Sequence, residues 1–233
     1  MVSESKIKRD LNALVDNLVQ KSPFLRLWSG GGMEAAMGEK FLLTFNSLVR
    51  SFPSLIAAGA ARARDEKTRT VLAVNLYQEC GEGDVSRTHH AVYRKYLSSV
   101  GLDASREPEE AFALQWRADL LDYITGTAKA PAALGALAAG EFLAQPVLSR
   151  IYPILQSLYP NADQEYFTKH LDLETEHVQE ITELLADQVS DEKEWNEVVD
   201  GFKFGLSVWE SYFANLAEFL TQDKAFGTMT NAD

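Results

Sequence analysis

The chain has 233 residues and a formal net charge of −12. Its length and its hydrophobic content of 46% suffice for one buried core, so we expect a single domain over residues 1–233. The acidity argues against nucleic acid or an anionic membrane surface as the main partner, because both carry negative charge themselves.

The N-terminal segment is polar and amphipathic, and it lacks the apolar core of a signal peptide. No uninterrupted apolar run approaches the roughly 20 residues that span a bilayer. Cys80 is the single cysteine and cannot form an internal disulfide, which agrees with a reducing compartment. We therefore expect a cytoplasmic protein with no membrane partner. Cys80 itself is interpreted as a small buried packing residue rather than a ligand or nucleophile.

Helical periodicity dominates the sequence, and no stretch keeps the strict alternation of a half-buried strand, so the predicted fold class is all-α. The predicted helices cover roughly residues 4–21, 33–62, 67–80, 87–99, 107–126, 132–159, 164–187 and 191–222. Ser22-Pro23 closes the first helix, and Asp191 with Glu194 resembles a capping box for the last. The connections are short, which again favours one domain.

The first candidate metal ligands lie where two predicted helices meet. Glu79 ends one helix, Gly81 and Gly83 favour a break, and His89 begins the next helix. Such a break lets Glu79 and His89 converge on one point. The competing carboxylate, Glu82, would need an unbroken helix to reach His89, so we favour Glu79.

His90, the neighbour of His89, points roughly 100° away from it on a helix. We therefore expect His90 to face solvent or to form a hydrogen bond rather than to bind metal. Asp84 or Ser86 is the predicted cap of the helix that follows.

The predicted helix 132–159 contains Pro146 and Pro153, and each must remove a backbone hydrogen bond and bend or break the helix. Glu141 lies just upstream, in a stretch so apolar that the helix should be buried on most sides. A buried carboxylate costs on the order of several kcal/mol unless it is protonated, paired or bound to a metal. Taken alone, Glu141 is compatible with a surface position or with a partner such as Arg150. The histidine segments favour a metal ligand.

The second histidine segment places three potential ligands on one helix. His170, Glu174 and His177 follow one another at i, i+4 and i+7, which stacks them on a single face over two turns. Nitrogen and carboxylate ligands together suit iron, manganese or zinc better than calcium or magnesium.

These segments, in this order, resemble the haem-oxygenase-like diiron oxidases and oxygenases. The resemblance is carried by Asn75-Leu76, Glu79, Gly81, Gly83 and His89, by the isolated Glu141, and by His170-xxx-Glu174-xx-His177. It implies a haem-oxygenase-like bundle of about seven core helices that holds two irons in place of haem. It also implies that the six metal ligands are Glu79, His89, Glu141, His170, Glu174 and His177. Many family members have aspartate where this chain has Glu174.

The resemblance further implies a non-haem oxidoreductase that uses dioxygen as co-substrate. Known members act on amino acids, amines or fatty acids, and we expect a small amino acid or amine to be oxidised in secondary metabolism. Arg87, Arg94, Arg117 or Arg150 could hold a substrate carboxylate. A homodimer is expected by analogy with related bundles.

Aromatic residues of the last helix could line the substrate pocket, although an aromatic stripe at helical spacing is more often core: Phe202, Phe204, Trp209, Tyr212 and Phe213. The metal ligands should order the weak helix around Gly81 and Gly83, because binding supplies free energy that the local sequence lacks.

Three other functions compete with a diiron enzyme. A metal-independent relative of thiamine-salvage or quinone-cofactor-synthesis enzymes would have no reason to gather histidines. A haem-degrading enzyme needs a histidine near the N-terminus, and none precedes His89. A helical interaction module would have merely structural histidines and would not take up Fe(II).

Overall fold

The computed structural model describes residues 2–29, 33–106, 108, 110–126 and 129–222, which form helices and no strand. The elements are α1 (Glu4–Lys21), α2 (Pro23–Ser29), α3 (Ala35–Arg62), α4 (Glu66–Glu79), the 3₁₀ turns η1 (Gly81–Gly83) and η2 (Val85–Arg87), α5 (His89–Ser99), the turn η3 (Ala104–Arg106), α6 (Ala111–Thr125), α7 (Ala130–Leu158), α8 (Glu165–Gln188) and α9 (Glu192–Thr221). The all-α prediction is confirmed.

Helix α2 is the one α-helix that the sequence patterns did not predict. α1 does end before Ser22-Pro23, but Pro23 then starts a new helix instead of a loop. The Ser22 hydroxyl accepts a hydrogen bond from the Leu25 amide at 3.3 Å, and proline is well suited to the first turn of a helix because its missing N–H is not needed there. A proline was therefore a start signal as well as a stop signal.

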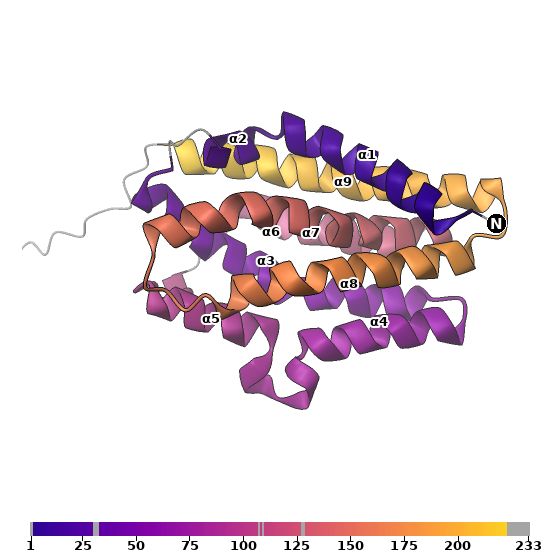
Figure 1. The fold of residues 1–233 in the computed structure, drawn as a ribbon, viewed down its shortest axis with the longest axis horizontal. Helices are drawn as coiled ribbons and strands as arrows, with labels where there is room; N and C mark the ends of the chain where they lie inside the picture. Colours follow the sequence, from indigo (N-terminus) through magenta and orange to yellow (C-terminus); the bar gives the residue numbers. More distant parts are fainter. Residues whose placement is uncertain (1, 30–32, 107, 109, 127–128, 223–233) are drawn as a thin grey trace, which may run out of the picture.

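Helix α7 runs through the middle of the bundle and contacts α9, α8, α3, α6, α1 and α2 (Figure 1). It lies closest to α9, along a seam that we define by Gly135 of α7 and Gly201 of α9. A Cβ atom on Gly201 would lie 1.9 Å from the Ala132 carbonyl oxygen, and one on Gly135 would lie 2.1 Å from the Val198 carbonyl oxygen. Glycine is required at both positions, because the two backbones touch there.

Pro146 and Pro153 do not break α7, which continues to Leu158. A third internal proline, Pro53, lies within α3 and was not noticed in the sequence. Packing on most sides of α7 keeps the helix intact where the local hydrogen bonds are missing, as tertiary contacts commonly override local preference.

Helices α3 and α7 are long and apolar enough to cross a membrane by length and composition alone, although no uninterrupted apolar run of that length was expected. In the bundle, 56% of the apolar window of α3 and 78% of that of α7 are buried. Core helices of a bundle have the same character, so these two windows are weak indications of a span.

Asp191 caps α9 as predicted, but the return hydrogen bond of Glu194 comes from Ser190, the residue before the cap, and not from the Asp191 amide. The Glu194 amide donates to Asp191 Oδ1 at 2.8 Å, and Glu194 Oε2 accepts from the Ser190 amide at 3.0 Å. Arg64, from the connection between α3 and α4, lies 2.8 Å from Glu194 Oε1 and lowers the pKa of this carboxyl to about 2. The cap therefore also ties α9 to the connection that precedes α4.

Candidate metal centre

A corner between α4 and α5 places Glu79 and His89 side by side. Gly81, Glu82 and Gly83 all have positive φ, at 71°, 57° and 91°. A Cβ atom on Gly81 would lie 2.5 Å from the Thr88 amide nitrogen, so the two arms of the corner touch at this glycine. Left-handed backbone is easy for glycine but costs a glutamate roughly 1–2 kcal/mol. The predicted break is confirmed, and it turns the end of α4 toward the start of α5.

Glu79 and His89 form a close buried pair at this corner. Glu79 Oε1 lies 2.8 Å from His89 Nδ1, and the two residues are 7% and 2% exposed. Within the described part of the chain, neither ring nitrogen of His89 has a well-directed hydrogen-bond partner. Burial alone would raise the pKa of the Glu79 carboxyl, but contact with His89 and the nearby His170 and His177 lower it overall.

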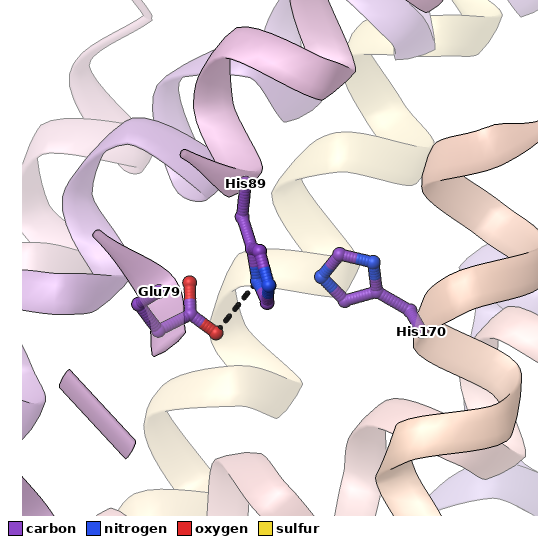
Figure 2. A group of neighbouring side chains, drawn as sticks. All are labelled: Glu79, His89 and His170. Atoms are coloured by element: carbon purple, nitrogen blue, oxygen red, sulfur yellow. Dashed lines mark ion pairs between the residues drawn. The ribbon is translucent and has the colours of Figure 1, made fainter. Parts of the chain in front are cut away.

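His170 of α8 completes a three-residue cluster with this pair. One ligand atom from each of Glu79, His89 and His170 lies within 4.8 Å of the others, and Figure 2 shows the His170 ring extending toward His89. The His170 and His89 ring centroids are 4.5 Å apart.

The main-chain carbonyl of Tyr166, one turn before His170, fixes the orientation of that ring. His170 Nδ1 donates to the Tyr166 carbonyl at 2.7 Å, which leaves Nε2 for a metal. Burial and the neighbouring His89 lower the pKa of His170 to about 4. The ring is therefore neutral at neutral pH, as a metal ligand must be.

Glu141 and His177 form a second pair, on α7 and α8. Glu141 Oε2 lies 3.5 Å from His177 Nδ1, and the residues are 5% and 6% exposed. Both residues also line the cavity that borders the three-residue cluster. Glu141 is thus a buried carboxylate beside a histidine, whereas Arg150 is exposed on the same helix and does not line that cavity.

The cavity beside these five residues is otherwise lined by apolar and aromatic side chains, including Phe45, Phe52, Tyr166, Trp209 and Phe213. It encloses about 710 Å³ of space outside the protein atoms, part of it open to solvent, and the centre of a water molecule can reach about 90 Å³. Among the described residues, no arginine or lysine lines it. The site therefore offers metal-type donors at one wall and a hydrophobic surface elsewhere.

The structure brings five of the six predicted ligands to this one cavity: Glu79, His89, Glu141, His170 and His177. The sixth, Glu174, lies in α8, but its side chain is outside the described residues. The competing carboxylate, Glu82, is at the surface, 3.4 Å from Arg87.

His90 and Cys80, two neighbours of the predicted ligands, differ in their surroundings. His90 Nε2 lies 3.1 Å from Asn46 Oδ1, which confirms that His90 is a hydrogen-bonding residue. Cys80 is exposed, so its interpretation as a buried packing residue is wrong. The turn at Gly81 directs this side chain outward while Glu79 points into the bundle.

The expected substrate contacts are only partly correct. Arg87, Arg94, Arg117 and Arg150 are all exposed, and none lines the cavity. Of the α9 aromatics, Trp209 and Phe213 line the cavity, and Phe202, Phe204 and Tyr212 do not.

The sequence analysis did not identify the α3 side of the cavity. Phe45 and Phe52 lie there on one face of α3, two helical turns apart. Their spacing of seven residues was a visible signal, but an aromatic pair at helical spacing usually marks core. Tyr166, which stands four residues before His170, was also missed as a cavity residue.

The donor set fits a transition metal such as iron. Buried carboxylate oxygens and imidazole nitrogens converge, one ring has its free nitrogen oriented by a carbonyl, and the His89 nitrogens lack well-directed partners. A purely structural cluster would leave these buried polar atoms poorly satisfied.

Comparisons with known proteins bear on the family and on the fold of this chain. The profile of a protein family described as an iron-containing redox enzyme matches residues 39–210. A search of curated proteins gives no match.

Several solved structures are similar to this chain in fold. A CADD-like protein of unknown function from Nostoc punctiforme has a TM-score of 0.80 and 17% identity, with 94% of this chain and 99% of that chain covered. A domain of unknown function with a haem-oxygenase-like fold from Shewanella denitrificans has a TM-score of 0.76 and 16% identity, with both chains fully covered at 100%. A TenA homologue from Pseudomonas syringae pv. tomato has a TM-score of 0.67 and 11% identity, with 92% of each chain covered. These likenesses show a haem-oxygenase-like fold.

Proposed function

Because the chain belongs to the iron-containing redox enzyme family, we propose that its buried cluster holds a non-haem diiron centre that uses dioxygen to oxidise a small organic substrate. The observation that carries this proposal is the convergence of Glu79, His89, His170, Glu141 and His177 on one apolar cavity. Two irons bring four positive charges, and three glutamates including Glu174 would offset three of them in a buried site.

The two groups of donors support two metal positions. Glu79, His89 and His170 cluster within 4.8 Å, and Glu141 lies 3.5 Å from His177 across the same cavity. Bound iron would supply the redox chemistry and open coordination positions for dioxygen. Glu174, on the same helix as both α8 histidines, is proposed as the sixth ligand.

The protein's own part is to orient the donors and to exclude water. The Tyr166 carbonyl holds Nδ1 of His170, so this histidine presents Nε2 without rearrangement. The lowered pKa values of Glu79 and His170 keep the carboxylate charged and the ring neutral at neutral pH, so no proton has to leave either group when metal binds. Aromatic and aliphatic side chains cover the remaining wall, which favours a substrate held beside the centre away from bulk water.

The cavity supports a substrate with an apolar body. An amino acid with an apolar side chain, or an amine, would place its hydrocarbon against Phe45, Phe52 and Trp209. A substrate carboxylate would find no arginine or lysine among the described lining residues. We therefore favour an amine over a polar amino acid within the expected substrate class.

A metal-independent enzyme of the same fold is the alternative, since a TenA homologue shares the architecture. Such chemistry needs a cysteine or glutamate nucleophile in the pocket. Cys80 is exposed at the α4–α5 corner, and the carboxylates that line the cavity, Glu79 and Glu141, are each paired with a histidine. The buried histidines favour the metal enzyme.

The test is anaerobic loading with Fe(II), removal of free iron, and exposure to dioxygen with a panel of amines and amino acids of graded side-chain length. We expect about two irons per chain and oxygen uptake that requires both iron and an apolar amine. His177→Ala should lose both, whereas His90→Ala, adjacent to His89 but bonded to Asn46, should retain both. A wild-type protein that binds no Fe(II), or a His177→Ala variant with full oxygen uptake, contradicts the proposal.

A further inference from the structure

A second, smaller cavity lies on the other side of Glu141, between α4, α7 and α8. Its polar lining consists of Asn75, Glu141, His177 and Glu180, and its remaining lining residues are aliphatic. The centre of a water molecule can reach about 10 Å³ of it, roughly the space of a single water. Glu141 and His177 thus border two spaces, an apolar one in front and this partly polar one behind.

Asn75 is the buried polar group of the second cavity. It lies one helical turn before Glu79 and is 8% exposed. Its side-chain oxygen has no hydrogen-bond partner among the described residues. A buried amide oxygen without a partner is unusual, because desolvation without a hydrogen bond is unfavourable. The atom is an acceptor suited to a cation or to a hydrogen-bond donor that passes through the cavity.

Glu180 is the polar lining residue of the second cavity that is partly exposed to solvent. It follows His177 by three residues, so the two share a face of α8, and its side chain is half-buried. Asn75, Glu180 and Glu141 therefore provide oxygen acceptors from the surface to the buried pair.

The two cavities differ in what they can admit. A hydrated divalent cation loses much solvation energy in the front cavity, where the described lining is apolar apart from the candidate ligands themselves. The rear cavity offers a carboxylate at its outer end and an amide oxygen inside, which replace part of the hydration shell.

We propose that Asn75 and Glu180 form the access route by which divalent metal ions reach the Glu141–His177 pair from solvent. This inference rests on the proposed metal centre and adds a division of labour to it. Metal arrives through the rear cavity, and the organic substrate arrives through the front cavity. Glu180 attracts the ion by its charge, and Asn75 supplies an oxygen contact along the way.

The test measures the rate of Co(II) uptake by metal-free protein. The visible absorption of bound cobalt, recorded after rapid mixing, monitors the uptake. Glu180→Gln removes the charge and keeps the shape, so the association rate constant should fall about five- to tenfold. Asn75→Leu replaces the amide inside the rear cavity by an apolar side chain of similar size, and it should slow uptake further. For Asn75→Leu, which narrows the passage without removing a charge, dissociation should slow in the same proportion and the equilibrium Kd should stay within about twofold. For Glu180→Gln, the loss of attraction should act mainly on association, so Kd should weaken by no more than the fall in the association rate constant.

Glu183→Gln is the matched control. Glu183 lies on the same helix, three residues beyond Glu180, is exposed, and lines neither cavity. The Glu183→Gln substitution removes the same charge, and its association rate constant for Co(II) should stay near that of the wild type. Raising the ionic strength should slow Co(II) uptake by the wild type more than uptake by Glu180→Gln.

Equal association rates for the wild type and Glu180→Gln overturn the route. A weaker Kd in Glu180→Gln with an unchanged association rate also overturns it, because Glu180 would then be a ligand. A wild type that takes up no cobalt and no iron overturns the proposed centre itself, and the route with it.

Discussion

The Glu141–His177 half of the candidate centre lies on two uninterrupted helices, whereas the Glu79–His89 half lies where α4 stops and α5 begins. In the first half, helix packing along α7 and α8 sets the positions of both side chains. In the second half, three consecutive residues with positive φ set them. The first half should therefore be formed before metal arrives, whereas the second half should depend on metal to stay formed.

The largest expected effect is on iron occupancy. His177→Ala should reduce bound iron from about two per chain to nearly none, because it removes a ligand from the preformed half. His89→Ala should leave about one iron per chain, because the α7–α8 half remains. The iron content per chain, determined after anaerobic loading and desalting, tests both variants. Helical content by circular dichroism should stay close to that of the wild type, and two irons retained by His177→Ala would remove the distinction between the halves.

Next in size is the effect of changing the corner itself. Gly81→Ala should lower the free energy of unfolding by about 2–4 kcal/mol, because it combines a left-handed φ with a Cβ position 2.5 Å from the Thr88 nitrogen. Gly83→Ala is the control, since it has a similar φ and nothing closer than 3.9 Å, and it should cost only about 1 kcal/mol. Chemical denaturation of the metal-free variants compares them. Equal losses would mean that the contact at Gly81 does not hold the corner closed.

A smaller effect follows from His170, which faces the corner. Its folded-state pKa of about 4 lies below the ordinary value of 6.5, so the unfolded chain binds more protons between these two values. The stability of metal-free protein should therefore fall as the pH drops from about 6.5 toward 4, by on the order of 2 kcal/mol. Below 4.5 the lowered pKa of Glu79 adds to the loss. Denaturation across this range should show a shallower slope for His170→Asn, and an unchanged slope would mean that burial of the neutral ring is not responsible.

The smallest expected effect is in hydrogen exchange. Fe(II) should slow exchange of backbone amides in residues 74–86 by about tenfold, roughly 1.4 kcal/mol of added local stability, and should change the α7 segment around Glu141 much less. Mass spectrometry of peptides with and without Fe(II) measures the ratio. Equal protection of residues 74–86 in both states would show that the corner is preformed.

Local patterns in the sequence were enough to predict the helical fold and the two histidine segments, whereas the convergence of Glu141 with them rested on the family resemblance. The spacing of His170 and His177 on one helix and the paired glycines after Glu79 are visible without tertiary information. Cys80 and the four arginines were less predictable. Their exposure depends on how the corner turns and on which helix faces meet, and a single sequence does not show either.

The two cavities could not be predicted from the sequence either. Asn75 stands beside Leu76 in a stretch that resembles the family pattern, but its unpartnered oxygen emerges only when α4 packs near α7 and α8. Phe45 and Phe52 likewise become cavity walls only through helix packing, which brings the Phe52 ring against Gly140 of α7, a residue with no side chain.

The glycine seam between α7 and α9 has a consequence for redesigning this protein. Gly135 lies six residues, or about 9 Å along the helix, from Glu141. Because the seam leaves no space for α7 to slide or rotate, it fixes the position of Glu141 along the bundle without touching any candidate ligand. The α3 wall, with its half-buried Phe45 and Phe52, has no such constraint. A designer who wishes to admit a larger substrate should therefore vary the α3 wall and leave the seam alone, since a substitution at Gly135 or Gly201 would emerge as a defect in metal binding far from where it was made.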